Sequence, residues 1–175
     1  SLGFDGSWVA HPALVRACTD SFTEVLGDRP NQLERQRPEV HVSSRDLVDV
    51  SSAGGEITLD GLRTNIRVSL QYLAAWVGGQ GAVAIDNLME DAATVEISRM
   101  QVWQGVRHGA TTADGTTITR ELVLDVLADL VAGLTDDADE DTTERVAAAR
   151  DIFEAVSLAG SWPQFFTTYA YDHYL

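Results

Sequence analysis

The sequence has no lysine, a single cysteine and no long apolar run in its 175 residues. Without lysine, the chain cannot form a Schiff base with a carbonyl substrate. Cys18 has no partner for an internal disulfide or a thiolate metal cluster, and this fits a cytoplasmic location. No stretch approaches the roughly 18 consecutive apolar residues that span a bilayer, so no membrane partner is expected. The start, Ser1-Leu2-Gly3-Phe4, is typical of the middle of a longer chain rather than of a signal peptide.

Positive charge is also scarce, because 12 basic residues face 27 acidic ones and the net charge is −15. A chain this acidic repels phosphate backbones, and no local basic patch offsets the repulsion, so no nucleic-acid partner is expected. The 4 histidines are scattered and no pair of them has metal-ligand spacing. The acidic run at 136–141 lacks the glycine and distal glutamate of an EF-hand loop, which indicates a solvated loop without a bound metal.

Residues 1–27 predict one strand-loop-helix unit. The segment at 3–11, GFDGSWVAH, is short, apolar and flanked by glycine, as buried strands are. Pro12 suits the first turn of a helix, apolar residues then follow at helical spacing, and Gly27 suits the helix end. A lone strand cannot pair with itself, so this unit is expected to belong to a larger sheet.

Residues 28–43 predict a linker, because they are polar and contain Pro30 and Pro38. The arginines in and just after this segment could contact a phosphate. The alternative is a solvated connector without a ligand, which is the commoner role of such a charged stretch.

Residues 44–175 predict a helical domain of about five helices. Ser43 or Ser44 is expected to begin a short helix, and Thr58 and Thr119 are expected to cap longer ones. The run at 82–85 is short and apolar, and fits an extended segment. A helix is expected from about 87 to 108 with Gly109 as its stop. Asp141 and Glu144 have the spacing of a capping box for the last long helix, and the aromatic tail is expected to lie on the core.

Two adjacent carboxylates, Glu90 and Asp91, fall where the helix at 87–108 should begin. Asn87 and Glu90 have the spacing of a capping box, so helix initiation alone explains Glu90. Asp91 lies one position beyond the box, beside the small side chains of Ala92 and Ala93. Small neighbours would let a ligand approach the Asp91 carboxylate closely.

Several long stretches resemble the malate synthase family, in particular its shorter, A-type members. The stretch at 87–99, NLMEDAATVEISR, resembles the family's signature. The stretch GFDGSWVAHPALV (3–15) resembles its last barrel strand and loop, and DRPNQLERQR (28–37) resembles the connector that follows. Residues 59–110 resemble the core of its C-terminal helical domain. The resemblance therefore covers essentially the whole chain.

The resemblance implies a mainly α fold. Residues 1–27 would be the remnant of the last β/α unit of a TIM barrel, and residues 28–43 the linker. Residues 44–175 would be the C-terminal helical plug domain, a bundle that closes the mouth of the barrel. Barrel enzymes carry their active sites at the C-terminal ends of the strands, where the segment at 3–11 would finish.

The resemblance also implies an acyltransferase of the glyoxylate cycle. Malate synthases condense acetyl-CoA with glyoxylate and hydrolyse the thioester to malate and CoA. By the family's motifs, Asp91 would be the catalytic base, Trp8 would lie by the glyoxylate pocket, and Pro12 would lie near the acetyl-CoA end. Arg99 does not match the family's catalytic arginine and is explained more simply as the partner of Glu96, three residues earlier.

Asp91 is not expected to act alone. A carboxylate is a weak base and a thioester methyl a very weak acid, and a mismatch on the order of ten pKa units costs roughly 14 kcal/mol. The family stabilises the enolate with an arginine and polarises glyoxylate with Mg²⁺, and both are held by earlier barrel strands. The 175 residues alone are therefore expected to be inactive and to bind no cofactor. A stand-alone helical binding or scaffold module without catalysis is the alternative.

Overall fold

The computed structural model describes residues 1–162 and 164–174, which divide into two compact units, Ser1–Gly54 and Gly55–Leu175. In the first unit, a 3₁₀ turn at Pro12–Leu14 leads into helix α1, Val15–Leu26. The turn begins as predicted, because Pro12 occupies its first position and the His11 ring accepts a hydrogen bond from the Ala13 amide at 3.1 Å. Helix α1 ends at Gly27, whose φ of 59° favours glycine.

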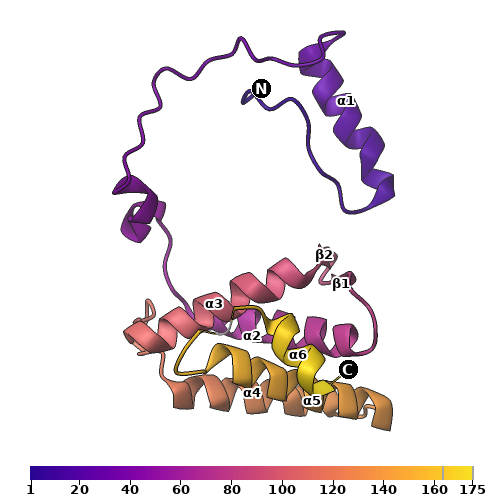
Figure 1. Ribbon diagram of the computed structural model, residues 1–175, viewed down its shortest axis with the longest axis vertical. Helices are drawn as coiled ribbons and strands as arrows, with labels where there is room; N and C mark the ends of the chain where they lie inside the picture. Colours follow the sequence, from indigo (N-terminus) through magenta and orange to yellow (C-terminus); the bar gives the residue numbers. More distant parts are fainter. Residues whose placement is uncertain (163, 175) are drawn as a thin grey trace. The chain divides into compact units, whose positions relative to one another are not determined.

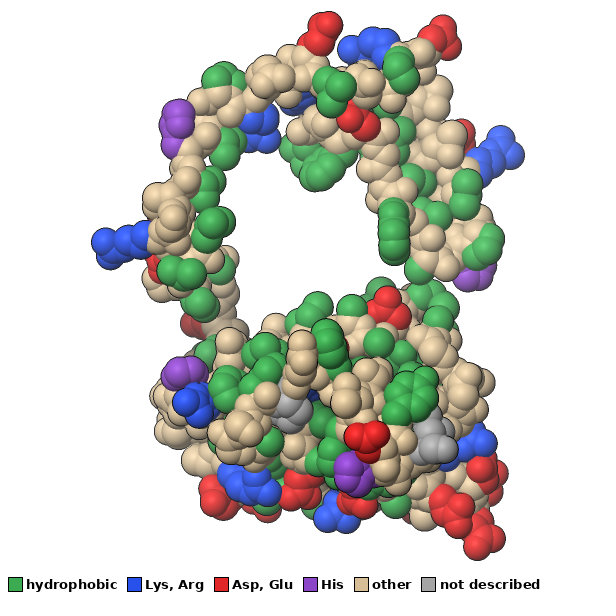
Figure 2. All heavy atoms as spheres, in the orientation of Figure 1, with side chains coloured by type: hydrophobic (Ala, Val, Ile, Leu, Met, Phe, Trp, Pro, Cys, Tyr) green, Lys and Arg blue, Asp and Glu red, His purple; other side chains and the backbone are tan. Residues whose placement is uncertain are grey.

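The strand predicted at 3–11 does not form in this unit. The segment has no strand assignment, because the first unit offers no neighbouring strand with which its amides and carbonyls could pair. It is held instead by Gln32, whose amide donates to Asp5 at 2.7 Å and whose side chain donates to the Phe4 carbonyl at 2.6 Å. Apolar side chains stay exposed along this unit, as Figure 2 shows in green, with Phe4 65% and Leu47 78% accessible.

The connector contains no helix up to residue 45. Two 3₁₀ turns, Asp46–Val48 and Val50–Ala53, replace the short helix predicted from Ser43 or Ser44. The Asp46 carboxylate accepts hydrogen bonds from the Ser43 amide and hydroxyl, which closes a tight local turn instead of extending a helix.

The second unit contains five α-helices and one hairpin among its described residues. These elements are α2 Leu59–Val77, β1 Val83–Ile85, β2 Leu88–Glu90, α3 Ala92–His108, α4 Arg120–Thr135, α5 Glu140–Ser157 and α6 Phe166–Tyr174. Helix α2 is central, since it packs against α3, α4, α5 and β1 (Figure 1). The predicted helical bundle of about five helices is thus confirmed, as is the extended run at 82–85.

The core of this unit forms where the apolar stripe of α2 meets α3, α4 and α5. Ile66, Leu70 and Leu73 of α2 are fully buried, together with Val95 of α3 and Phe153 of α5. Each such side chain contributes about 1.5–3 kcal/mol on burial. The core therefore fixes α2 and α3 relative to each other, and these are the two helices that flank the hairpin.

Local signals located most helix ends correctly. The Thr58 hydroxyl accepts from the Gly61 amide at 3.0 Å, and the Thr119 hydroxyl accepts from the Leu122 amide at 3.2 Å, so both cap as predicted. Gly109 ends α3 in the left-handed region. The prediction for α5 was wrong, because Asp139 and not Asp141 is its cap and accepts from the Thr142 amide at 2.8 Å. Of the helices in the described part, none is long and apolar enough to cross a membrane.

Candidate active site

The hairpin β1–β2 carries the chain into α3 and so determines where Asp91 lies. Its strands pair Val83 with Glu90 and Ile85 with Leu88. The two residues between them, Asp86 and Asn87, have φ values of 50° and 64°. Two successive positive φ values are typical of a two-residue hairpin turn, which favours Asn and Asp. Asn87 is therefore a turn residue, and the prediction that it caps a helix was wrong.

Asp91 is itself the N-cap of α3. Its backbone is extended, with φ −130° and ψ −174°, and its Oδ1 accepts from the Ala93 amide at 2.9 Å. Glu90 is not part of a capping box, because it ends β2 and accepts a hydrogen bond from the Thr94 hydroxyl. The prediction that Glu90 begins the helix was therefore wrong: Asp91 begins it, and Glu90 is the last residue of β2.

The Asp91 carboxylate is exposed, and only one of its oxygens is engaged. The described residues make no hydrogen bond to Oδ2. Leu88, Met89 and Ile97, on the hairpin and the first turns of α3, are 62%, 41% and 60% accessible. An exposed and oriented carboxylate, one oxygen of which accepts no hydrogen bond from the described residues, can accept a proton from a ligand that binds at this surface.

Tyr72 of α2 lies beneath this segment. Its side chain is 1% accessible, and its hydroxyl donates to the Gly81 carbonyl at 2.8 Å, just before β1 begins. Burial raises the pKa of the Tyr72 phenol, and the negative charge of Asp91 raises this pKa further. Tyr72 is therefore a neutral hydrogen-bond donor, and its hydroxyl interacts electrostatically with Asp91.

Helix α2 also holds the hairpin at its turn. Arg67 Nη2 lies 2.6 Å from Asp86 Oδ2, and Ile85 is buried against the core. The hairpin is thus attached to α2 at both ends, by Tyr72 at its entrance and by Arg67 at its turn.

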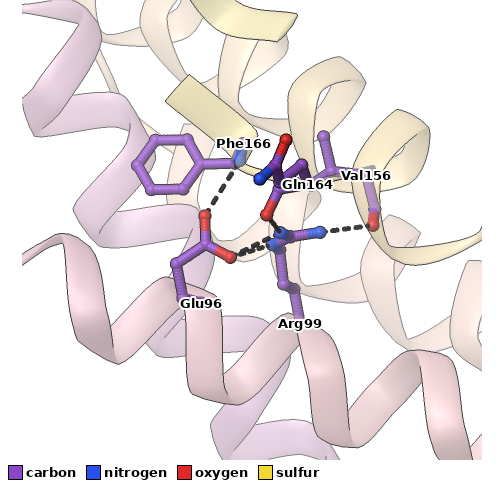
Figure 3. A network of polar contacts seen from close by, with 5 residues as sticks. All are labelled: Glu96, Arg99, Val156, Gln164 and Phe166. Carbon is purple, nitrogen blue, oxygen red and sulfur yellow. Dashed lines mark hydrogen bonds and ion pairs between the residues drawn. The ribbon is translucent and has the colours of Figure 1, made fainter. Parts of the chain in front are cut away.

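A buried ion pair lies further along α3. Arg99 is 0% accessible, and its Nε lies 2.6 Å from Glu96 Oε2, which confirms the predicted pair (Figure 3). The two other guanidinium nitrogens donate to the Val156 and Gln164 carbonyls, each at 3.2 Å. The other oxygen of Glu96 accepts from the Phe166 amide at 2.9 Å. The network therefore ties α3 to the end of α5 and the start of α6.

Aromatic contacts complete this attachment of the tail. The Arg99 guanidinium lies 3.9 Å from the centre of the Trp162 ring, and Trp162 packs edge to face against Trp103 at 5.2 Å. The Trp103 indole donates to the Ala159 carbonyl at 3.1 Å. Phe166 is fully buried, so the prediction that the aromatic tail lies on the core is confirmed.

The other two predicted site residues belong to the first unit, which is described by itself. Trp8 lies in the segment before the 3₁₀ turn and is 98% accessible. Pro12 is exposed and begins that turn. Both side chains are therefore available to a ligand or to a further part of a barrel.

The described residues do not fit a metal site. They contain no group of three or more His, Cys, Asp or Glu side chains that could hold a metal ion. Mg²⁺ requires several oxygen ligands in octahedral geometry, and no such set converges here. The Mg²⁺ that the resemblance implies therefore has no set of ligands among the described residues.

Reasoning from sequence missed Tyr72 and the burial of Arg99. Tyr72 lies four residues after Val68 and four before Trp76, and this helical spacing of apolar side chains indicates a second packed face of α2. For Arg99 no local signal exists, because its carbonyl partners lie 57 and 65 residues along the chain.

Comparison with known families gives two matches. The C-terminal domain of malate synthase matches residues 56–174, and the malate synthase TIM barrel domain matches residues 1–50. These ranges coincide closely with the two compact units. The class is thus defined as a malate synthase C-terminal domain preceded by a part of a TIM barrel.

Relatives match at high identity. The malate synthase of Myxococcus xanthus (strain DK1622) is 46% identical over 175 residues, which cover 97% of this chain and 31% of that protein. The malate synthase of Streptomyces clavuligerus is 43% identical over 97% of this chain and 32% of its own length. Malate synthase A of Escherichia coli (strain K12) is 42% identical over 73% of this chain and 24% of its own length. The chain belongs to the malate synthase family, and it spans about a third of the length of the Myxococcus and Streptomyces relatives.

Proposed function

We propose that this chain is the C-terminal part of a malate synthase and supplies the catalytic base, Asp91. The substrates are acetyl-CoA and glyoxylate, and the products are malate and CoA. The observation that carries the proposal is the Asp91 carboxylate, exposed at the N-terminus of α3 with Oδ1 held by the Ala93 amide. We further propose a cytoplasmic location, which the single cysteine supports.

The proposed reaction begins with proton transfer. Oδ2 of Asp91 takes a proton from the acetyl methyl group, and the electron pair of the broken C–H bond forms the thioester enolate. The enolate carbon then bonds to the aldehyde carbon of glyoxylate, while the π electrons of the aldehyde move to its oxygen, which takes up a proton and becomes the hydroxyl of the malyl thioester. Water finally cleaves the C–S bond of this thioester and gives malate and CoA. The hydrogen bond that the Ala93 amide donates to Oδ1 orients the Asp91 carboxylate, so Oδ2 is the oxygen that remains for the methyl proton.

The enolate needs positive charge that Asp91 cannot supply. We infer that an arginine and the ligands of a Mg²⁺ ion, which would polarise the glyoxylate carbonyl, are provided by barrel strands beyond this chain. Trp8 would border the glyoxylate pocket and Pro12 the acetyl-CoA end, and their exposure supports contact with substrate. The 175 residues alone would therefore be inactive.

A chimera tests this proposal. The chain would replace the matching C-terminal part of the Myxococcus xanthus malate synthase, to which it is 46% identical. CoA release from acetyl-CoA with glyoxylate would be measured for the chimera, for Asp91→Asn and for Asp125→Asn. Asparagine also caps helices, so Asp91→Asn removes the base and leaves α3 intact. Asp125 is exposed on α4 and provides the matched control.

The chimera should turn over, Asp125→Asn should match it, and Asp91→Asn should have a kcat lowered by at least about a hundredfold. A kcat of Asp91→Asn within about tenfold of the chimera would reject the assignment of the base. A folded chimera without activity would favour a helical binding module that has lost catalysis.

A further inference from the structure

Helix α2 is hydrogen-bonded to the residues that enter the hairpin. The pairing of β1 with β2 brings these residues close to Asp91. The Tyr72 hydroxyl donates to the Gly81 carbonyl at 2.8 Å, two residues before β1. In the antiparallel register, Val83 at the start of β1 lies opposite Glu90 at the end of β2. Gly81, just before β1, and Asp91, just after β2, therefore lie at the same end of the hairpin. We call this the open end, because the turn at Asp86 and Asn87 closes the other.

We propose that Tyr72 is a positioning residue, which sets the location of the Asp91 carboxylate through the open end of the hairpin. The inference rests on the proposed function, because it gives Tyr72 a role only if Asp91 is the base. Arg67 serves as a second attachment at the opposite, turn end of the same hairpin.

The chain geometry makes this coupling direct. Strand β2 ends at Glu90 and Asp91 follows immediately, so a shift of the open end moves the base. The hairpin has only three residues in each strand and cannot hold its own position by pairing alone. Tyr72 lies on a helix that packs against three other helices and against β1, so its own position is fixed. The negative charge of Asp91 raises the pKa of the Tyr72 phenol, in agreement with the placement of both groups at the open end.

A purely structural tyrosine would behave differently. Its loss would lower the free energy of unfolding, and the folded protein would retain its catalytic rate. A positioning tyrosine affects the rate of the folded enzyme, because a displacement of about 1 Å in a catalytic group can cost on the order of a hundredfold in rate.

The test uses Tyr72→Phe in the chimera, which keeps the buried ring and removes only the hydroxyl. The matched control is Tyr169→Phe, in which the same atom is removed from a tyrosine of α6 that stacks on His173. Tyr72→Phe should lower kcat by roughly ten- to a hundredfold, with KM for acetyl-CoA changed by less than about threefold. Tyr169→Phe should leave both parameters unchanged.

A second readout needs no activity. In the 175-residue chain, the ¹³C signal of the Asp91 carboxyl should shift in Tyr72→Phe and stay in place in Tyr169→Phe. Arg67→Met, which removes the exposed turn contact, should lower kcat in the same direction by a smaller factor. This variant decides the question if Tyr72→Phe does not fold: an unchanged kcat in Arg67→Met would then overturn the inference.

The two proposals fail in distinguishable ways. An inactive Asp91→Asn together with a Tyr72→Phe enzyme whose kcat stays within twofold of the parent would overturn the role of Tyr72 alone. An active Asp91→Asn would overturn the proposed function, and the role of Tyr72 with it.

Discussion

Replacing Arg99 by methionine should show how strongly the buried ion pair holds the tail of the second unit. Arg99 is fully buried and bonds to Glu96 and to the carbonyls of Val156 and Gln164. Methionine fills a similar volume with an apolar chain. The substitution therefore removes charge and hydrogen bonds while it leaves only a small cavity.

The magnitude follows from what is left behind. Breaking a buried ion pair by removing one partner costs about 3–5 kcal/mol, because the remaining charge is uncompensated. The Glu96 side chain is 27% accessible and keeps its bond from the Phe166 amide, so water screens part of that charge. We therefore expect Arg99→Met to reduce the free energy of unfolding by about 3 kcal/mol, the lower end of that range. This loss is a large part of the roughly 5–15 kcal/mol that typically stabilises a folded domain.

Urea unfolding of the 175-residue chain, followed by far-UV circular dichroism, measures this loss directly. The double variant Glu96→Gln/Arg99→Met should be more stable than Arg99→Met alone, because it removes the orphaned carboxylate while its amide oxygen still accepts from Phe166. A loss below about 1 kcal/mol in Arg99→Met, or a double variant less stable than the single one, would refute this account of the network.

Two further predictions concern stability. Gly105→Ala in α3 should reduce the free energy of unfolding by about 1–3 kcal/mol and so lower Tm in calorimetry. The new Cβ would lie 3.2 Å from the buried Ile118 Cδ1, and this crowding outweighs the preference of alanine for helix. An unchanged or higher Tm would show that Ile118 can move aside. Asp139 caps α5, and its hydrogen bonds from Thr142 hold the pKa of its carboxyl below the ordinary range. A lowered pKa in the folded state stabilises at pH values above the unfolded pKa, and this contribution is lost as the pH falls through the folded pKa. The deficit of Asp139→Asn in urea unfolding should therefore be present at pH 7 and disappear in acid, and a deficit independent of pH would contradict the assignment.

The helices of the second unit could be predicted because their signals are local. The stripe of Ile66, Leu70 and Leu73 on α2 has helical spacing, and Thr58 and Gly109 are strong start and stop signals. These features depend on residues within one or two turns of each other. The sequence therefore contained enough information for the bundle and for most of its ends.

The start of α3 was predicted wrongly because asparagine suits two structures. Asn87 is favoured both as a helix cap and as a turn residue with positive φ, and the spacing to Glu90 matched a capping box. The turn is formed and not the helix cap, because β1 pairs with residues 88–90 and holds them in an extended strand. The adjacent Asp86 and Asn87 suit such a turn, but the capping-box spacing from Asn87 to Glu90 favoured a helix instead.

The candidate site was only partly accessible from sequence. The motif around Asp91 singled out the carboxylate, and the structure adds that it is exposed and oriented by the Ala93 amide. The hydrogen bond from Tyr72 to Gly81 and the burial of Arg99 depend on groups brought together by folding. The carbonyl partners of Arg99 lie 57 and 65 residues away, and contacts of that range have no periodicity that could predict them.

The rate of CoA release by the Asp91→Asn chimera, relative to its parent, tests the central claim most directly. A general base contributes typically a hundred- to ten-thousandfold, so we predict a kcat lowered by at least about a hundredfold in a protein with unchanged circular dichroism. A kcat within tenfold of the parent would contradict the assignment of Asp91 as the base.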